Sequence, residues 1–272
     1  MKKVLRIILY VLLIAIILVS TFLFIRLQLS YVKGEKSYSK LSQYVKKPSK
    51  KPVKKPVQNT PPKNDSNNQT AAPQPLEEEE FEWPLVDFDE LLKINDDLVG
   101  WIYIEDTNVN YPIVQGPDND FYLYKMFDGN YNRAGSIFMD SASSDDFSDE
   151  NTIIHGHHMK NDTMFSWLPK YKQQQFYDQH PTVLIMTPSQ NYKLHLFSGY
   201  VTDTASSAWK LDFSSGEFDQ WLQEISSKSN FIPLAMPDSS DRIVTLATCD
   251  YDFEGARYIL HGFLEGESSG LS

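Results

Sequence analysis

The spacing of apolar and polar residues marks one segment near the start of the chain as a membrane anchor. Residues 7–25 form a run of nineteen residues without a charge, and a helix of that length spans about 30 Å of hydrocarbon. A cleaved signal peptide is the alternative, but it usually has an apolar core of about 7–15 residues followed by a small-residue cleavage site. No such site follows here. We therefore predict an uncleaved anchor over residues 1–32.

The pattern changes after the anchor. Residues 33–80 are rich in Lys, Pro, Asn and Gln and nearly free of large apolar side chains. Such a composition does not bury enough apolar surface to offset the entropy of ordering. We predict a disordered, basic, Pro-rich tether over this range, followed by one globular domain over residues 81–272.

Short β-like runs dominate the globular domain. Residues 98–116 alternate apolar and polar positions around Trp101 and Ile104, with Asn and Gly at the breaks. Further β-like runs follow at residues 134–140, 151–157, 182–187, 192–202, 242–249 and 256–265. Short strands separated by frequent turn signals favour a closed barrel or a sandwich with inserted helices.

A few segments have helical spacing instead. Residues 87–95 are predicted to form the first helix of the domain, with Asp87 as its N-cap. Residues 215–228 are amphipathic, with Ser214 or Ser215 available as a cap. Apolar residues at positions i, i+3, i+4 and i+7 share one face of that segment: Phe218, Trp221, Leu222 and Ile225. Residues 162–179 are interpreted as one or two short helices.

The distribution of charge excludes one class of partner. Residues 26–63 carry eleven basic residues and one acid, whereas residues 64–272 carry thirty-five acids and eleven basic residues. An acidic domain argues against nucleic-acid binding, which needs a basic footprint. The basic stretch is interpreted first as a solvated linker extended by charge repulsion, and contact with anionic lipid headgroups or wall polymers is the alternative. Basic residues lie on both sides of the apolar run, so charge does not settle its orientation.

The single cysteine of the chain, Cys249, ends one of the β-like runs. If that run pairs with the next as a hairpin around the loop 250–256, Cys249 and Arg257 become neighbours, because cross-strand partners lie about 4.5–5.5 Å apart at their Cβ atoms. A guanidinium there favours a thiolate and can donate to a developing oxyanion. A buried, inert cysteine beside an arginine that pairs with Asp250 or Asp252 is an equally consistent interpretation of these residues alone.

A thiolate nucleophile also needs an acid–base partner, usually histidine. Three of the six histidines cluster in one β-like run, as His155, His157 and His158. The cluster raises the hypothesis of a zinc site, but the spacing lacks the H-E-x-x-H pattern and no second cysteine is available to complete a site. We therefore predict no metal and no other cofactor.

Taken together, these motifs resemble those of the sortase family. The letters TLATC at Thr245–Cys249 fit its T-L-x-T-C motif, and Arg257 fits its active-site arginine. The letters IIHGHHM fit the strand end that carries its histidine, with His157 in the catalytic position. The segment is similar to that of class B sortases, in which a tyrosine usually stands where this chain has His155. The resemblance covers roughly residues 87–265.

The resemblance implies a mainly β fold, a closed eight-stranded sortase-like barrel with N-terminal helices. It also implies a helix between the sixth and seventh strands, where the amphipathic segment 215–228 lies. Family members are held by a single-pass N-terminal helix in the cell membrane of Gram-positive bacteria, with the catalytic domain extracellular. We expect the same topology here, with the tether crossing wall polymer.

The activity that the resemblance implies is transpeptidation of surface proteins that bear a C-terminal sorting signal. Cys249 would attack a Thr carbonyl to form a thioacyl enzyme, His157 would transfer the protons, and Arg257 would hold the oxyanion. The acyl acceptor would be an amine of a peptidoglycan precursor or, in a pilus-building enzyme, a pilin lysine. An interpretation from another class is a membrane-anchored binding module in which Cys249 is inert.

Three further residues are candidates for substrate binding. Asn110 and Val114 match positions that line the substrate groove of class B sortases. Ordinary barrel residues are the alternative interpretation of both. Thr248, next to the cysteine, is the third candidate.

Overall fold

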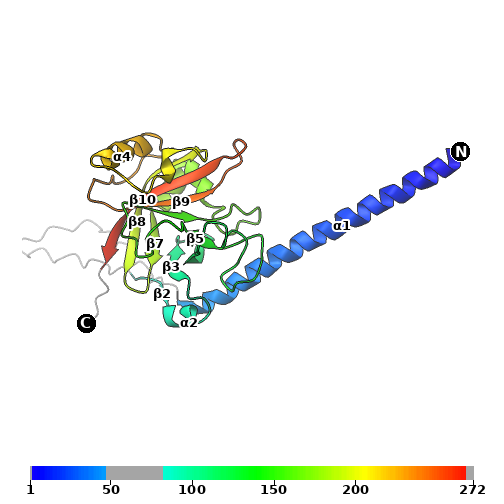
Figure 1. Ribbon diagram of the computed structural model, residues 1–272, viewed down its shortest axis with the longest axis horizontal. Helices are drawn as coiled ribbons and strands as arrows, with labels where there is room; N and C mark the ends of the chain where they lie inside the picture. Colours follow the sequence, from blue (N-terminus) through cyan, green and yellow to red (C-terminus); the bar gives the residue numbers. More distant parts are fainter. Residues whose placement is uncertain (1, 47–81, 268–272) are drawn as a thin grey trace, which may run out of the picture.

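A closed β-barrel forms the body of the molecule, and a long helix leads away from one side of it (Figure 1). The computed structural model describes residues 2–46 and 82–267. Most of the expected tether, residues 47–80, therefore lies outside the described residues.

Eight strands close the barrel in the order β10-β8-β7-β3-β4-β5-β6-β9. The strands are β3 (Leu98–Tyr103), β4 (Asn110–Gln115), β5 (Ile137–Met139), β6 (Asn151–His155), β7 (Thr182–Met186), β8 (Asn191–Thr202), β9 (Ile243–Cys249) and β10 (Arg257–Glu267). Two pairs, β4–β5 and β6–β9, are parallel, and the other barrel pairs are antiparallel. The closed eight-stranded barrel is confirmed, and each predicted β-like run overlaps at least one of these strands.

Strand alternation divides the core into an interior and an outer layer. In β9, Val244 and Leu246 belong to the cluster inside the barrel, whereas Ile243 and Ala247 belong to a cluster on the outer face. The helix α4 (Glu217–Ser227) covers that outer face and lies between β8 and β9, the sixth and seventh strands of the barrel.

The predicted amphipathic helix is confirmed in position and in its buried face. All four of its predicted apolar residues are buried: Phe218, Trp221, Leu222 and Ile225. The predicted serine cap is wrong, because the N-cap is Gly216 with φ of 77°, a left-handed conformation that favours glycine. Ser214 instead bonds the carboxylate of Glu217, with its hydroxyl at 2.8 Å and its amide at 3.0 Å.

The N-terminal helix is longer than expected. The helix α1 (Lys2–Leu41) continues nine residues past the predicted boundary at residue 32, and the short strand β1 (Val45–Lys46) pairs with β2 (Leu85–Val86). Leu41 and Val45 are buried in an outer cluster of the barrel. The docked part of residues 33–46 is therefore ordered, because a few apolar side chains suffice to hold the segment in place when they pack on the surface of the barrel.

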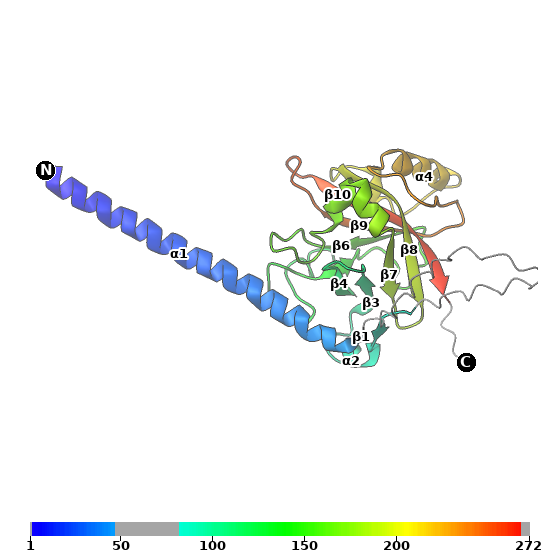
Figure 2. The same ribbon diagram turned by 180° about the vertical axis from the view of Figure 1, so that it is seen from behind.

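Figure 2 shows the far end of α1 extending well beyond the barrel. The apolar part of this helix is long and apolar enough to cross a membrane. Hydrogen bonds also join the last third of α1 to barrel loops. They include Asn132 Nδ2 to Ser30 O at 3.0 Å, Asn161 Nδ2 to Glu35 Oε1 at 2.7 Å and Tyr38 Oη to Gly135 O at 2.6 Å.

The remaining helices are short. The predicted helix at residues 87–95 is present as α2 (Phe88–Leu92), and Asp87 caps it by accepting a hydrogen bond from Glu90 N at 3.1 Å. The predicted helical region 162–179 contains η2 (Leu168–Lys172) and α3 (Gln174–Gln179). Two further 3₁₀ turns are η1 (Ser42–Tyr44) and η3 (Ser207–Trp209).

Candidate active site

Cys249 and Arg257 are direct cross-strand partners at the loop end of the β9–β10 hairpin. The turn between them is closed by a backbone hydrogen bond from Asp250 N to Ala256 O at 2.9 Å. The predicted hairpin is therefore confirmed, with the register that sets the two side chains side by side. Arg257 Nη1 donates to the carbonyls of Gly255 and Ala256, both at 3.1 Å.

His157 joins these two residues in the lining of one cavity of about 300 Å³. Cys249 is half-buried there. The cavity lies on the outer face of the barrel, over the ends of β6 and β9. Its other walls come from the same strands and from two loops, through Leu123, His155, Gly156, Thr204, Trp209, Ala247 and Thr248. Sequence patterns carried no signal for Leu123, Thr204 or Trp209, because loops distant in the chain carry them.

A backbone carbonyl fixes the orientation of the His157 ring. Its Nε2 lies 2.7 Å from Leu123 O, and because a carbonyl only accepts, the proton sits on Nε2 and Nδ1 is left to accept one. The ring also packs on Tyr124, with centroids 5.7 Å apart. Burial lowers the pKa of His157 below its ordinary value, against the opposing effect of the Leu123 hydrogen bond.

The chain brings His157 close to β9 through a tight backbone contact at Gly156. The amide of Gly156 donates a hydrogen bond to Ala247 O at 3.0 Å. A Cβ at Gly156 would lie 2.5 Å from Ile137 Cδ1 and 2.6 Å from the ring of Phe165, so only glycine fits. Thr248 locks the same segment, because its hydroxyl donates to Gly156 O at 2.7 Å. Thr248 is 2% exposed, so its hydroxyl holds the strand end together.

His158 links the two loops that carry the site. Its Nδ1 lies 2.9 Å from Cys249 O, and Tyr251 Oη donates to His158 O at 3.2 Å. The rings of His158 and Tyr251 are in contact, with centroids 4.8 Å apart. The position of His158 after a strand end, within the histidine cluster, did not indicate this contact.

His155 forms part of the cavity wall and has its own acidic partner. Its Nε2 lies 3.0 Å from Asp140 Oδ2. The ring stacks on Phe138 at 5.1 Å and on Trp209 at 6.1 Å. Burial raises the pKa of Asp140, but hydrogen bonds, first among them that from His155, outweigh it and leave the pKa below the ordinary value. His155 thus contributes a paired aromatic ring to the cavity wall.

The structure does not place Asn110 or Val114 in this cavity. Val114 has no exposed surface and packs in an outer cluster with Phe138. Asn110 accepts a hydrogen bond from Trp101 Nε1 at 2.7 Å and lines a different cavity, next to α1. Tyr122, from the loop after β4, belongs to the same buried cluster as Val114, which sequence spacing alone did not indicate.

An ion pair holds the loop that follows Cys249. Lys172 Nζ lies 3.1 Å from Asp250 Oδ1 and 2.9 Å from Asp252 Oδ2. The side chain of Asp250 is 4% exposed, whereas that of Lys172 is 29% exposed. Asp250 is therefore paired with Lys172, and in the described residues Arg257 does not form the alternative ion pair.

The described residues contain no group of three or more His, Cys, Asp or Glu side chains arranged to hold a metal ion. The chemistry available at the cavity is that of a thiol, an imidazole and a guanidinium. A half-buried thiol beside a histidine and an arginine can serve acyl transfer.

Comparison with known proteins assigns the family. A family model described as a sortase domain matches residues 102–265. Sortase B of Listeria monocytogenes is 39% identical over 178 residues, which cover 64% of this chain and 72% of that protein.

Solved structures give the same result. A crystal structure of Staphylococcus aureus sortase B has a TM-score of 0.64 at 35% identity, covering 66% of this chain and 87% of that one. The X-ray structure of Clostridium perfringens sortase B has a TM-score of 0.63 at 36% identity, covering 66% of this chain and 100% of that one. The chain belongs to the sortase family, in its class B group.

Proposed function

We propose that this protein is a cysteine transpeptidase that cleaves a C-terminal sorting signal at a Thr carbonyl and joins the surface protein to a cell-wall amine. The observation that carries the proposal is the convergence of Cys249, His157 and Arg257 on one cavity. The family supplies the reaction class, a sortase transpeptidase.

Cys249 is the proposed nucleophile. Its sulfur attacks the Thr carbonyl carbon, and collapse of the tetrahedral intermediate expels the downstream amine and leaves a thioacyl enzyme. An incoming amine then attacks the thioester, which releases Cys249 and forms a new amide bond. The partial exposure of Cys249 in a cavity argues against an inert, buried thiol.

His157 is the proposed proton carrier. As an imidazolium it protonates the departing amine, and as a neutral ring it takes a proton from the incoming amine. The Leu123 carbonyl holds Nε2, so Nδ1 is the atom that gains and loses this proton. One histidine can serve both half-reactions because they run in opposite directions.

Arg257 is the proposed oxyanion ligand. Its Nη1 is held by two loop carbonyls, and its Nη2 and Nε make no hydrogen bond to a described residue. These groups are available to donate to the oxygen of the tetrahedral intermediate. The two carbonyl contacts would orient the guanidinium before substrate arrives.

Two solved complexes of sortase B proteins support the choice of substrates. Staphylococcus aureus sortase B has been solved as a substrate complex, and a sortase B structure has been solved with triglycine. By analogy, we propose that this protein binds a sorting-signal peptide and accepts an amine from a peptidoglycan precursor. A pilin lysine is the competing acceptor, to be distinguished by assay.

We further propose that α1 anchors the protein in the cell membrane of a Gram-positive bacterium, with the barrel outside. The support is the run of residues 7–25, whose length matches a bilayer core. Listeria monocytogenes and Staphylococcus aureus, the sources of the curated relatives, are Gram-positive.

The test uses the full-length protein in detergent micelles with sorting-signal peptides. We expect mass spectrometry to detect a thioacyl adduct on Cys249, and an amide product when a wall-precursor amine or a lysine peptide is added. Cys249→Ala should abolish both species. Arg257→Ala should fold normally and slow thioacyl formation by about 10²–10³-fold, as loss of an oxyanion donor does elsewhere.

The controls separate catalysis from binding. Full activity of Cys249→Ala would contradict the proposal. Failure of iodoacetamide to alkylate Cys249 in the folded protein near neutral pH would favour the binding-module interpretation. The acceptor that gives amide product, wall amine or lysine peptide, decides between wall anchoring and pilus assembly.

A further inference from the structure

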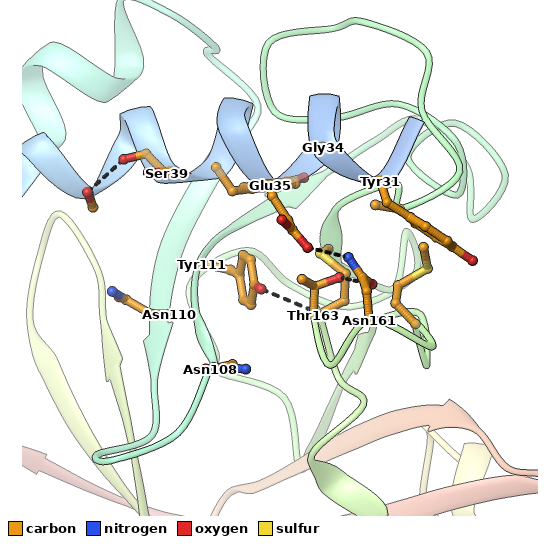
Figure 3. A pocket seen from close by; sticks show the side chains of 14 residues that line it. Tyr31, Gly34, Glu35, Ser39, Asn108, Asn110, Tyr111, Asn161 and Thr163 are labelled. Atoms are coloured by element: carbon orange, nitrogen blue, oxygen red, sulfur yellow. Dashed lines mark hydrogen bonds between the residues drawn. The ribbon is translucent and has the colours of Figure 1, made fainter. Parts of the chain in front are cut away.

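A second cavity, of about 260 Å³, lies between α1 and the barrel (Figure 3). One wall is the face of α1 that carries Tyr31 and Tyr38, and the other includes Asn110 and Asn161 from the barrel side. It shares no lining residue with the cavity that contains Cys249. It is therefore a separate site.

The loop 156–164 forms a wall of both cavities. His157 lines the cavity of Cys249, whereas Met159 and Asn161 line the cavity beside α1. Asn108, from the loop before β4, ties the far end of the same loop, because its Nδ2 donates to Asp162 O at 3.0 Å. A molecule held against α1 would thus lie next to the segment that carries the proposed acid–base residue.

The lining of this second cavity is almost uncharged and rich in hydrogen-bonding groups. Three tyrosines, three asparagines, two serines and a threonine contribute to it. Glu35 is the one charged residue among the described residues that line it, and its carboxylate already accepts a hydrogen bond from Asn161. A phosphate or carboxylate would find no cation among these lining residues, which disfavours an anionic ligand.

Two polar groups on opposite walls have no hydrogen-bond partner in the described part of the chain. Asn110 uses its Oδ1 to accept from Trp101, which leaves its NH₂ group for a ligand. The hydroxyl of Tyr31 also makes no hydrogen bond to a described residue. Aromatic rings next to free amide and hydroxyl groups suit a ligand that has both hydroxyls and apolar C–H faces.

Size and position narrow the ligand further. The volume lies just below the range of about 300–1,000 Å³ typical of pockets for drug-sized ligands, which suits a single ring. Tyr31 lies six residues after Ile25, the end of the uncharged run, or about 9 Å further along a helix. The headgroup layer of a bilayer is about 5–7 Å thick on each side. The cavity would therefore open just outside the headgroups.

We propose that this cavity binds an uncharged sugar ring, from a wall glycan or from the head of a membrane-embedded glycolipid, beside the acyl-transfer site. The inference rests on the proposed function, in which the acyl acceptor is an amine of a wall precursor. Such a site would retain the acceptor molecule next to the loop of His157. It would act on acceptor binding and leave the attack of Cys249 on the sorting signal unchanged.

The test measures binding to full-length protein in lipid nanodiscs, with Cys249→Ala in every sample so that no turnover occurs. The soluble probe is N,N′-diacetylchitobiose, followed by calorimetry, and the membrane probe is a glycolipid with an N-acetylglucosamine head placed in the same nanodisc. Tyr31→Ala should weaken binding about tenfold, the size expected for loss of one aromatic contact. Tyr31→Phe keeps the ring and should lose less affinity.

The matched control is Val32→Ala, the adjacent residue of α1, which is 58% exposed and outside the cavity. It should bind as the unmodified chain does. Binding of both probes would assign the site to the sugar ring alone, and binding of the glycolipid alone would assign it to a membrane-held head. An equal loss of affinity for the probes in the Tyr31 and Val32 variants, or no loss in either, would overturn the proposal. Saturable binding of a wall peptide without sugar would also overturn it.

A separate assay keeps this inference distinct from the proposed function. Thioacyl formation from a sorting-signal peptide needs no acceptor, so Tyr31→Ala on the active chain should form the adduct at the normal rate. Its KM for an acceptor that carries the sugar should rise about tenfold, the loss expected for one aromatic contact, while its KM for a small free amine should not change. Adduct formation without sugar binding defeats only the inference, and sugar binding without adduct formation defeats only the proposed function.

Discussion

At the scale of single residues, His157 lies where its neutral form is favoured. It is partly buried in the cavity wall, and a backbone carbonyl fixes one of its ring nitrogens. Burial destabilises the imidazolium more than this hydrogen bond stabilises it, so the pKa of His157 is lowered. At neutral pH the ring therefore rests as a base, and the imidazolium needed to expel the amine forms as the thiol proton is transferred.

The lowered pKa leads to a testable pH dependence. We expect the His157 ring in Cys249→Ala protein to titrate by NMR with a midpoint below about 6.5, the unfolded value. Because the folded pKa is the lower one, the unfolded chain takes up the proton first. The contribution of this residue to stability is thus complete above about pH 6.5 and is lost as the pH falls toward the folded pKa, at up to about 1.4 kcal/mol per pH unit.

The matched measurement compares urea unfolding of this protein and its His157→Gln variant between about pH 5 and pH 7, the range that brackets the ordinary histidine pKa. The variant should lose less stability on acidification. Identical pH dependence of the two proteins, together with an NMR midpoint at or above the unfolded value, would contradict the account.

How far the sequence predicts this site depends on how local each contact is. The pairing of Cys249 with Arg257 could be predicted from the sequence because a hairpin register and a short loop determine it. The roles of the Leu123 carbonyl and of Trp209 could not be predicted from the sequence, because each reaches the cavity through a loop whose path depends on the folded barrel. Strand alternation likewise gives the face on which Asn110 and Val114 lie but not what covers that face, so it does not indicate that both lie outside this cavity.

At the scale of elements, the β9–β10 loop is held from outside by η2. Lys172, the last residue of η2, pairs with Asp250 and Asp252 directly after the cysteine. Desolvation lowers the pKa of Lys172, but hydrogen bonds to both carboxylates outweigh it and leave the pKa above the ordinary value. The strongest part of this contact is the one with Asp250, whose side chain is almost fully buried.

Breaking this pair should disturb both stability and catalysis. Lys172→Met is expected to lower the free energy of unfolding by about 1–3 kcal/mol, less than the roughly 3–5 kcal/mol of a fully buried pair because solvent reaches the ammonium. The loop next to Cys249 would loosen, so kcat for thioacyl formation should fall more than KM rises. Urea unfolding and single-turnover kinetics measure the two effects.

A double-mutant cycle with Asp250→Asn is the control. If the ion pair is responsible, the double variant should lose less stability than the two single losses together. Strictly additive losses would show that the two side chains do not act as a pair.

Most elements were predicted in type and place, and the exceptions have physical causes. The amphipathic spacing of α4 is a local property, so its buried face followed directly from the sequence. Its cap did not, since the chain enters the helix through the left-handed backbone of Gly216 rather than through a serine side chain. The continuation of α1 was missed because its docking residues are few and contact a surface formed by distant parts of the chain.

At the scale of the whole molecule, the end of α1 is part of the barrel's packing. Leu41 and Val45 are buried, and Tyr38 packs edge-on against Tyr111 with ring centroids 5.2 Å apart. The globular unit therefore begins within α1 and not at residue 81. Its boundary is set by these contacts, which composition did not predict.

A truncation series tests this boundary. A chain that starts at residue 82 should unfold with about 2–4 kcal/mol less free energy than one that starts at residue 27, because it loses the burial of Leu41 and Val45. Urea denaturation followed by tryptophan fluorescence measures the difference. The control is the full-length protein in detergent, which should match the chain from residue 27, and equal stability of the two truncated chains would refute the prediction.

The unbroken course of α1 from its apolar run to the barrel also fixes a height. Leu41 lies sixteen residues after Ile25, or about 24 Å along the helix axis. An anchor that crosses the membrane as proposed would hold the cavity of Cys249 at a constant height above the membrane and in a constant orientation. A flexible linker would let both vary. Substrates would then have to present their reacting groups at that fixed height above the membrane. Each residue inserted into α1 between Ile25 and Ser30, before the first contact with the barrel, would lift the barrel by about 1.5 Å and turn it by about 100°. Catalysis at the membrane should therefore vary with the length of the inserted segment in step with the helical turn.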